Sequence, residues 1–484
     1  MTATGPGGAL AVIDHGKTNV RVLVLDPAGR VIGAEGTPNL VRPGPPWRHH
    51  DLAALSGWVF AALARLAARH GVRAVVPAGH GSGGVLVTAD PDAGGDGAAL
   101  PMPDYEEPFP PPLDALYRPL AGGFLDRGSA VMMASTHQAR QLFRMQAEAP
   151  QAVAGAAHYL SVPQYWAWRL SGVAVSEFST LGAQSHLWNV ADRVWTPIVR
   201  AMGWGRLLPP PVPSHTALGT LRPGLAARYG MPPGMTVFAG GHDSSLNFHR
   251  YRAAGLSGLT LVSTGTWIVA MSDGADPTRL DEARGMTLNS DTEGRPVGGA
   301  LNMGGRAFAM IAGKAGAALA ATDPAEVAAA VKAGTMALPS FTPDDGQFPG
   351  SGRQGRIVGP DPATPAARRS VAALYAALLT EATVRALGAT SRVVLDGTFL
   401  SDPLYAPLVA ALLPATPVFT SRETAGVAAG AAMLARRGEG SPADVPLDRA
   451  ATLAVPGLPD YAESWRRFAE GAGGSGAETT GAGR

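Results

Sequence analysis

The stretch LAVIDHGKTNVRVLVLDPAGRVIGAEG, residues 10–36, predicts that the chain opens with a β-meander. Two apolar runs flank a polar tip at residues 14–19, and a Pro-Ala-Gly turn at 27–29 leads into a third run. Apolar runs of this length, bounded by glycine and polar residues, are typical of strands joined by tight turns. The first tip brings a carboxylate, a glycine and a hydroxyl group together, and a turn alone does not require all three.

A helix and a further strand follow the meander. Apolar residues recur with helical spacing from an N-cap at Asp51 to a closing glycine at Gly71. Residues 73–78 then have the composition of a buried strand. Three hairpin strands, a helix and another strand predict an α/β domain with a mixed sheet.

The second half of the chain repeats this order. Residues 258–274, GLTLVSTGTWIVAMSDG, again place a glycine-threonine turn between two apolar strands. A helix after Thr364 and a strand at 393–396 come later, and further helices and a strand follow up to residue 437. Such a distant internal repeat predicts two domains of related topology that face one another. The alternative is a chance similarity of two hairpins.

Composition excludes several classes of protein. Hydrophobic residues make up 46% of the 484 residues and charged residues make up 16%, which supports a large buried core. The length suggests two or three domains. The net charge of +1 lacks the positive excess that is typical of proteins that bind nucleic acids. The lack of cysteine rules out disulfides and thiolate metal sites. No apolar run reaches the ~18 residues of a membrane span, and residues 1–10 lack signal-peptide features. We therefore expect a cytoplasmic globular protein without a membrane or nucleic-acid partner, and a disordered glycine-rich tail at 471–484.

The two hairpin tips could hold phosphate groups. Glycine lets a phosphate approach free main-chain N–H groups, and a neighbouring threonine hydroxyl adds a donor. Lys17 could add positive charge, and Asp14 at the strand end could hold a hydrated Mg²⁺, which proteins usually bind through one or two carboxylates and phosphate oxygens. One such hairpin in each half fits a nucleotide held between two domains. The alternative is that both are only tight turns.

A third segment, FAGGHDSSLNFH at residues 238–249, places a carboxylate just after a strand. The strand ends in two glycines, and His242 and Asp243 follow. An aspartate there could accept a proton from a substrate hydroxyl, and phosphoryl transfer needs such a group together with positioning and charge neutralisation. Aspartate is also a common helix N-cap, and the two roles are compatible.

These motifs, taken in order, resemble the FGGY carbohydrate kinases, which share the fold of actin, hexokinase and the heat-shock chaperone ATPases. Residues 14–21 resemble the first phosphate motif of the family, 241–243 the segment with its catalytic base, and 263–266 its second phosphate motif. Residues 163–172, PQYWAWRLSG, resemble a further conserved region, and the whole likeness covers about residues 9–440. It implies an α/β fold of two actin-like (ribonuclease H-like) domains with mixed sheets around a central cleft. The sugar-binding domain would span 1–245 and the ATP-binding domain 246–470.

The resemblance implies an ATP-dependent sugar kinase that uses Mg²⁺. Asp243 would be the catalytic base, and Asp14 would hold Mg²⁺ through water. Contacts to the phosphates of ATP would come from Gly16, Lys17, Thr18, Asn19, Gly265, Thr266, Gly397 and Thr398. The sugar would contact His80, Gly81, Gln164, Tyr165, His242 and Asp243. Residues 423–430 would lie beside the adenosine.

Three departures from the family pattern limit these assignments. Lys17 stands where most members have a hydroxyl residue, and Gln164 stands where many have a sugar-binding aspartate. The usual Gly-Gly-Gly of the adenosine region is replaced by Leu395-Asp396-Gly397-Thr398. The Gly-x-Thr-Asn-x-Arg form of the opening motif is closer to the branch that acts on L-fuculose and L-rhamnulose, which predicts a small ketose. Lys17 leaves an acidic sugar, an aldonate, open.

The role of the whole chain and of several residues stays open. A non-catalytic sugar sensor, or pseudokinase, could use the same scaffold, and a homodimer is the expected assembly. His80 could cap a turn instead of binding sugar, and for Trp166 and Trp168 core packing is favoured over ligand contact. Residues 102–107, MPDYEE, could border the sugar site, but a solvated acidic loop is favoured.

Overall fold

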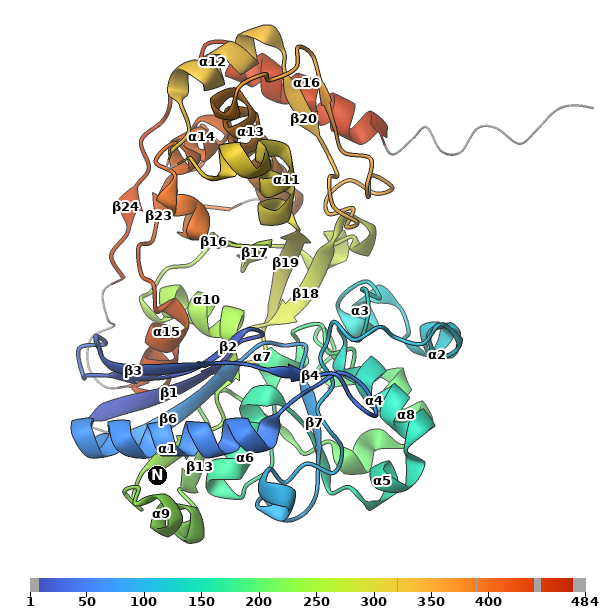
Figure 1. Ribbon diagram of the computed structural model, residues 1–484, viewed down its shortest axis with the longest axis vertical. Coiled ribbons are helices and arrows are strands. Elements are labelled where there is room, and N and C mark those ends of the chain that lie inside the picture. Colours follow the sequence, from blue (N-terminus) through green and yellow to red (C-terminus); the bar gives the residue numbers. More distant parts are fainter. Residues whose placement is uncertain (1–7, 320, 389, 439–444, 473–484) are drawn as a thin grey trace, which may run out of the picture. The chain divides into compact units, whose positions relative to one another are not determined.

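The computed structural model describes residues 8–319, 321–388, 390–438 and 445–472 and divides into two compact units (Figure 1). The first unit comprises 1–256, 288–296 and 425–445, and the second comprises 257–287, 297–424 and 446–484. The predicted boundary at 245/246 falls inside helix α10 (Asp243–Ala253), and the segment 425–445 belongs to the first unit. Of the predicted tail, all but Gly471 and Ala472 lies outside the described residues.

A seven-stranded mixed sheet forms the centre of the first unit. Its order is β13-β14-β6-β1-β2-β3, with β15 also paired to β6. The first three strands form the predicted antiparallel meander, whereas β1, β6, β14 and β15 run parallel. The bounds are β1 (Ala9–His15), β2 (Asn19–Leu25), β3 (Val31–Pro38), β6 (Val72–Gly79), β13 (Ala217–Thr220), β14 (Thr236–Phe238) and β15 (Gly241–His242).

Helices cover both faces of this sheet, and the alternation of side chains along β1 shows why. Ala11 and Ile13 pack into the cluster that contains α1 (Leu52–His70), whereas Leu10 and Val12 pack into the cluster that contains α15 (Gly426–Ala435). Successive side chains of a strand point to opposite faces, so a strand that is apolar throughout needs cover on both sides. Figure 1 shows α1 on one face and α10 and α15 on the other.

Helix α1 has the ends that the sequence predicts. The Asp51 carboxylate accepts a hydrogen bond of 3.0 Å from the Ala54 N–H, and Gly71 closes the helix with φ of 65°. Within the described ranges, α1 is the helix that is long and apolar enough to cross a membrane. Half of that apolar window is buried, as expected of a helix that packs on a sheet.

The sheet of the second unit repeats the topology of the first. Its order, β24-β23-β22-β16-β17-β19, corresponds strand by strand to β13-β14-β6-β1-β2-β3, and β18 is added at the edge. The directions also correspond, because β16 is antiparallel to β17 and parallel to β22. The predicted internal repeat is therefore confirmed. The bounds are β16 (Leu259–Thr264), β17 (Ile268–Ser272), β18 (Met286–Ser290), β19 (Pro296–Asn302), β22 (Arg392–Gly397), β23 (Val418–Thr420) and β24 (Asp448–Arg449).

Helix α13 (Pro365–Ala386) is the central helix of the second unit. It starts directly after Thr364, as predicted. The Thr364 hydroxyl accepts a hydrogen bond of 3.0 Å from the Ala367 N–H, and most residues of the helix are buried. The other helices and small strands of this unit are α11 (Gly304–Ala317), α12 (Pro324–Ala333), α14 (Tyr405–Leu412), α16 (Leu458–Ala472), β20 (Met336–Leu338) and β21 (Arg356–Val358).

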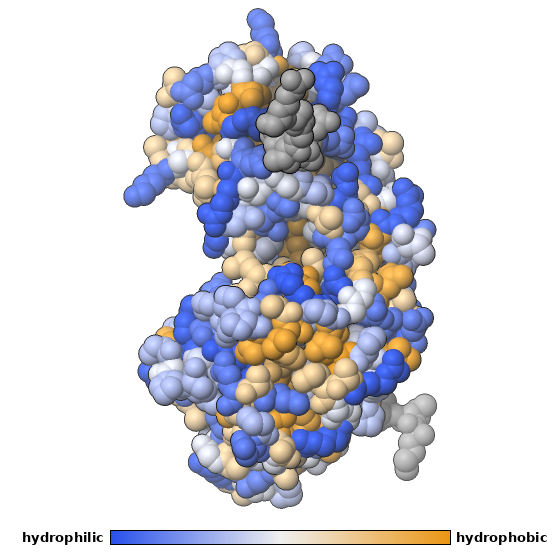
Figure 2. All heavy atoms as spheres, turned by 90° about the vertical axis from the view of Figure 1, so that its right-hand side faces the viewer, coloured by the Kyte–Doolittle hydropathy of each residue, from blue (hydrophilic) through white to orange (hydrophobic). Residues whose placement is uncertain are grey.

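The remaining elements of the first unit are short. They include α2 and, in the segment PQYWAWRLSG, α6. Figure 2 shows apolar side chains on the face of this unit that carries α2 and α3, where Leu116, Leu125 and Met133 are exposed. The bounds are β4 (Val41–Arg42), β5 (His49–His50), β7 (Gly84–Val87), α2 (Pro111–Tyr117), α3 (Phe124–Arg127), α4 (Gln138–Glu148), α5 (Pro150–Gly155), β8 (His158–Ser161), α6 (Val162–Ser171), β9 (Ser176–Glu177), α7 (Phe178–Leu181), β10 (Trp188–Asn189), β11 (Val194–Trp195), α8 (Pro197–Ala201), β12 (Pro211–Val212) and α9 (Pro223–Tyr229).

Candidate active site

Three neighbouring parallel strands of the first unit end together. Asp14 at the end of β1 lies opposite Ala78 of β6, which in turn lies opposite Gly241 of β15. Asp243 follows two residues later as the first residue of α10. In open α/β sheets, ligands bind at the carboxyl ends of the strands. The register thus brings the two predicted carboxylates to the same edge of one sheet.

Asp243 has a partly exposed carboxylate with one oxygen in use. Its Oδ1 accepts hydrogen bonds from the Ser244 N–H (2.5 Å) and the Ser244 hydroxyl (3.1 Å), and it lies 3.2 Å from Nε2 of His242. The N-cap of α10 is His242, so the predicted N-cap role of Asp243 is wrong. These contacts all involve Oδ1, which leaves Oδ2 for a substrate hydroxyl.

Asp14 is buried and interacts with both Arg21 and Asp243. Burial raises the pKa of Asp14, the Arg21 guanidinium opposes this, and the charge of Asp243 raises the pKa further. Arg21 and Asp243 therefore act on the pKa of Asp14 in opposite directions.

Asp14 has the free oxygen that a hydrated Mg²⁺ needs. Arg21 contacts only Oδ2, through Nη2 at 2.6 Å and Nε at 3.2 Å, so Oδ1 is left for a cation. The described residues contain no group of three or more histidine or acidic side chains that could hold a metal alone. Mg²⁺ usually takes most of its ligands from water and phosphate, so this donor set fits it.

The tip of the first hairpin is a tight turn in which the Gly16 N–H donates to the Asn19 carbonyl over 2.9 Å. Lys17 is not free to meet a phosphate, because its ammonium group forms an ion pair with Asp104 and lies 3.6 Å from a carboxylate oxygen of Glu106. Thr18 and Asn19 are exposed, and the amide of Asn19 donates to the Thr18 hydroxyl over 3.1 Å. Of the four residues expected to bind phosphate at this tip, Lys17 is the one whose positive charge is already paired.

The acidic stretch MPDYEE is not a solvated loop, contrary to the prediction. The side chain of Asp104 is fully buried and also accepts a hydrogen bond of 2.6 Å from Arg48. The ring of Tyr105 lies 5.5 Å from the ring of His80. Burial raises the pKa of Tyr105 to about 12, with smaller contributions from Glu106, Asp104 and Asp243. The stretch therefore packs beside His80.

His80 is the clearest ligand-binding candidate in the first unit. Both of its ring nitrogens are buried and have no hydrogen-bond partner among the described residues, which excludes the turn-capping role. Burial, with the nearby His50, lowers the pKa of His80 to about 3, so the imidazole is neutral. A neutral imidazole offers one donor and one acceptor, which is the pattern that a sugar hydroxyl complements.

Gln164 holds the loop that leads to Asp243. Its amide nitrogen donates to the Ala239 carbonyl over 3.1 Å, and its amide oxygen accepts from the Thr180 hydroxyl over 2.9 Å. The side chain is fully buried, and both ends are in use. Gln164 thus ties α6 to the loop before Asp243, and its contact with a sugar stays a prediction.

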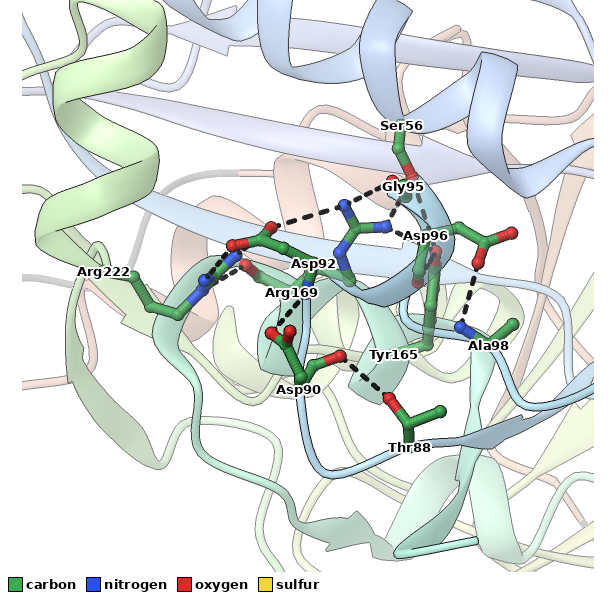
Figure 3. A network of polar contacts seen from close by, with 10 residues as sticks. All are labelled: Ser56, Thr88, Asp90, Asp92, Gly95, Asp96, Ala98, Tyr165, Arg169 and Arg222. Atoms are coloured by element: carbon green, nitrogen blue, oxygen red, sulfur yellow. Dashed lines mark hydrogen bonds and ion pairs between the residues drawn. The ribbon is translucent and has the colours of Figure 1, made fainter.

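Tyr165 is likewise engaged, in the network shown in Figure 3. Its hydroxyl donates to the Asp96 carbonyl over 2.9 Å and accepts from Arg169 over 2.9 Å. Arg169 also donates to the Ser56 hydroxyl at 2.7 Å and the Gly95 carbonyl at 3.0 Å. The network links residues 95–96 to α1 and α6.

The two tryptophans of α6 lie in the core, as predicted. Trp166 is fully buried, and its indole N–H donates to Nδ1 of His15 over 2.9 Å. Trp168 is also buried and packs in the same core cluster. Both indole rings are therefore packed in the core and are not available to line a ligand site.

Glu177 is a buried acid that the sequence reasoning missed. Its carboxylate accepts hydrogen bonds from the N–H groups of Ser179 and Thr180 and from the hydroxyls of Ser179 and Ser214. Burial raises the pKa of Glu177 to about 7, and the four donors oppose this. The Ser179 hydroxyl in turn accepts a hydrogen bond of 3.0 Å from the His242 N–H. Glu177 thereby supports the strand end beside Asp243, and the Ser-Thr pair two and three residues after it is the one local signal of a cap.

The second unit brings its own glycine-threonine hairpin to a strand end. Thr264 at the end of β16 lies opposite Gly397 of β22. Gly397 has φ of 95°, and a Cβ at this position would lie 2.1 Å from the Thr264 carbonyl oxygen, so only glycine fits. Gly265 has open space around its α-carbon, and Thr266 is exposed. The turn is therefore accessible to a ligand.

A cavity of about 290 Å³ lies beside this strand end. Thr398 and Phe399, directly after Gly397, form part of its wall, and an ion pair of 2.7 Å between Arg369 and Asp402 forms another part. The complete lining is Phe308, Ala317, Leu319, Arg369, Ala373, Ala376, Thr398, Phe399, Ser401, Asp402 and Tyr405.

Residues 423–430, expected beside the adenosine, do not line this cavity. Most of the segment belongs to the first unit, where α15 packs on α10. A Cβ at Gly430 would lie 1.9 Å from the Leu246 carbonyl oxygen. The structure thus assigns these small residues to helix packing within the first unit.

Comparison with known proteins finds matches to one protein family in both units of the chain. The N-terminal domain of the FGGY family of carbohydrate kinases matches residues 114–248, and the C-terminal domain of carbohydrate kinase FGGY matches 257–443. L-fuculokinase of Escherichia coli (strain K12) is 26% identical over 297 residues. That match covers 59% of this chain and 61% of the relative, which is less than two thirds of its length.

Solved structures extend the likeness over the whole chain. A carbohydrate kinase from Novosphingobium aromaticivorans is 31% identical with a TM-score of 0.85, over 96% of this chain and 99% of that one. A xylulose kinase from Lactobacillus acidophilus is 15% identical with a TM-score of 0.79, over 97% and 99% of the two chains, a likeness in fold alone. The family match and the full-length relative lead to one conclusion: the chain belongs to the FGGY family of carbohydrate kinases.

Proposed function

We propose that this protein transfers the γ-phosphoryl group of ATP to a hydroxyl group of a small sugar. The observation that carries the proposal is the arrangement at the first sheet edge. Asp14 and Asp243 come from distant parts of the chain to one site, near a buried neutral His80 without a hydrogen-bond partner among the described residues. A binding protein needs neither a base nor a ligand for Mg²⁺, so this combination favours a kinase over a sugar sensor or pseudokinase.

The sugar binds in the first unit against His80, Gly81, His242 and Asp243. His80 supplies a donor and an acceptor to one sugar hydroxyl. Gly81 lets the chain pass close to Ala183, because a Cβ at residue 81 would lie 2.4 Å from the Ala183 Cβ. Gln164 and Tyr165 act indirectly, since they hold the loops around this pocket.

Asp243 acts as the general base. Its free Oδ2 accepts the proton of the sugar hydroxyl as that oxygen attacks the γ-phosphorus. Gln164 and Glu177 fix the strand end before it, which keeps the carboxylate in position without a rearrangement during the reaction.

ATP binds in the second unit. The cavity of about 290 Å³ accommodates the adenine, and its aromatic walls suit a flat ring. Gly265, Thr266, Gly397 and Thr398 at the adjoining strand ends contact the phosphates, because both the open turn and the hydroxyl groups offer donors.

The hairpin tip of the first unit contributes to phosphate binding through Gly16, Thr18 and Asn19. Asp14 would hold Mg²⁺ through water, and the ion would neutralise charge on the phosphates. Lys17 does not contact the phosphates, because its charge is already paired with Asp104.

The substrate class follows from the similarity to L-fuculokinase and from the form of the opening motif. A small ketose such as L-fuculose or L-rhamnulose is the proposed acceptor. A cytoplasmic location and a homodimeric assembly remain predictions, and light scattering of the purified protein measures the latter.

A coupled assay for ADP release across a panel of sugars tests this proposal. The panel contains L-fuculose, L-rhamnulose, D-xylulose, glycerol and D-gluconate, and calorimetry measures binding of each sugar without ATP. We expect one sugar to stimulate ADP release well above the background hydrolysis of ATP. Tight binding of a sugar without any turnover would instead establish the sensor and reject the kinase.

A further inference from the structure

Two cations share one buried carboxylate at the border of the proposed sugar pocket. Lys17 pairs with Oδ1 of Asp104, and Arg48 donates to Oδ2 of the same group over 2.6 Å. The side chain of Asp104 is fully buried, whereas that of Lys17 is 19% exposed. The Glu106 N–H also donates to Oδ1 over 3.1 Å. Asp104 is thus held by three donors, and the charge of Lys17 is offset twice, by Asp104 and by the nearby Glu106.

This cluster adjoins the residues that face the sugar. The ammonium group of Lys17 lies 4.7 Å from the centre of the Tyr105 ring, and that ring lies 5.5 Å from the ring of His80. The ring of His50 lies 6.5 Å from that of His80, and the charges of Lys17 and Asp104 both contribute to the pKa shifts of these two histidines. A ligand bound at His80 would therefore lie close to the ion pair.

The pocket offers a negatively charged ligand no free positive charge among the described residues around it. His50 and His80 are neutral, and Arg21 is paired with Asp14. Asp243 adds a carboxylate of its own. An anion that leaves water needs a paired cation, because desolvation of an unpaired charge is very costly.

From this arrangement we infer that Asp104 determines the substrate class: by occupying Lys17 and Arg48, it selects neutral sugars and excludes aldonates and other sugars with a carboxylate. The inference rests on the proposed function of the same site. It reverses the simple expectation that a lysine at the hairpin tip favours an acidic sugar. Lys17 would recognise a carboxylate only if Asp104 were neutral.

The substitution Asp104→Asn tests the inference, because it removes the negative charge and keeps the shape. In the wild type, we expect kcat/KM for D-gluconate to be at least about 100-fold below that of the best neutral sugar. In Asp104→Asn, the released Lys17 can pair with the carboxylate of gluconate. A charge-assisted hydrogen bond of this kind makes the ratio of gluconate to neutral-sugar kcat/KM rise by about 10-fold or more.

The double substitution Lys17→Gln with Asp104→Asn is the matched control. It removes the lysine that would bind the carboxylate, so most of the gain on gluconate should disappear. Glu106→Gln tests the same inference if the Asp104→Asn protein is not stable enough to assay. It removes the other carboxylate near Lys17 at a half-exposed position, and we expect a smaller rise in the same ratio.

Calorimetric binding of L-fuculose and D-gluconate is measured in parallel with turnover. Preference of the wild type for gluconate, in binding or in kcat/KM, would overturn the inference and leave the kinase proposal intact. A folded Asp104→Asn protein without any shift toward gluconate would also overturn it. Binding of a neutral sugar without turnover would reject the kinase proposal, and the ranking of the ligands by affinity would still decide the inference.

Discussion

The side-chain amide of Gln164 donates a hydrogen bond of 3.1 Å to the main-chain oxygen of Ala239, four residues before Asp243. This bond ties α6 to the strand end from which the proposed base extends. A neutral amide suits the position, because a carboxylate there would face main-chain carbonyl oxygens. The identity of residue 164 therefore bears on the placement of the base more directly than on the choice of sugar.

Replacement of Gln164 should lower turnover without a matching change in sugar affinity. Gln164→Asp buries a negative charge against the Ala239 and Gly240 carbonyl oxygens and should lower both kcat, by about 10-fold or more, and the melting temperature. Gln164→Met keeps the approximate shape of the side chain, removes its amide and introduces no charge. It should lower kcat with a smaller loss of stability than Gln164→Asp. If Gln164→Asp instead improved kcat/KM for one sugar, a direct contact with the substrate would replace the positioning role.

The opening hairpin should serve the phosphates and Mg²⁺. Asp14→Asn removes the charge that would attract the ion, so we expect a higher Mg²⁺ concentration for half-maximal activity and a lower kcat. Thr18→Val keeps the size of an exposed side chain without its hydroxyl and should raise KM for ATP. These are cleaner changes than Gly16→Val, because a Cβ at residue 16 would lie 3.1 Å from the Asn19 carbonyl oxygen and strain the turn. Normal kinetics in both variants would show that the hairpin tip is only a tight turn and binds neither phosphate nor Mg²⁺.

The cavity of the second unit should hold the adenine. Ala376 is buried in its wall, and Ala376→Phe would fill part of the space. We expect KM for ATP to rise by about 10-fold or more, while sugar binding in the first unit stays unchanged. The same substitution at the exposed Ala329 of α12 is the control for general effects of an added ring. An unchanged KM for ATP in a folded Ala376→Phe protein would place the nucleotide elsewhere.

Buried histidines should make the first unit sensitive to acid. Burial lowers their pKa values, to about 4 for His50 and about 3 for His80, from the usual 6.5. The unfolded chain then binds more protons than the native one below pH 6.5, so stability is present above that pH and is lost as the pH falls toward 4 and 3. The same direction applies to His15, His137, His186, His242 and His249.

Proton uptake on unfolding measures this linkage directly. Calorimetry at pH 5 in two buffers of different ionisation enthalpy gives the number of protons taken up. His80→Asn should reduce that number by about one, because His80 is neutral when folded and almost fully protonated when unfolded at this pH. An unchanged uptake would mean that His80 already carries a proton in the native protein.

Local sequence signals predicted the elements well, because their causes are local. Asp51 and Gly71 cap their helix as expected, since a cap depends on residues within one turn, and α13 begins after Thr364 as predicted. The two glycine-threonine hairpins and the strand before Asp243 were also predicted. Their common sheet edges follow from the repeat of one topology in both units.

Long-range contacts explain what the sequence did not reveal. Asp104 has the surroundings of a surface acid in sequence, and its burial depends on Lys17 and Arg48, which lie far from it along the chain. Glu177 is held by Ser214 as well as by its own neighbours. The assignment of α15 to the first unit likewise depends on close packing between Gly430 and α10. Such pairings come from tertiary structure and leave no periodic signal.

The most direct test of the proposed mechanism is to measure kcat of Asp243→Asn with the sugar that best stimulates ADP release. Asparagine keeps the size of the side chain but cannot accept the proton. We expect kcat to fall by about 10²–10⁴-fold, with sugar affinity and melting temperature close to those of the wild type. Near-normal turnover by a correctly folded Asp243→Asn protein would contradict the assignment of Asp243 as the base.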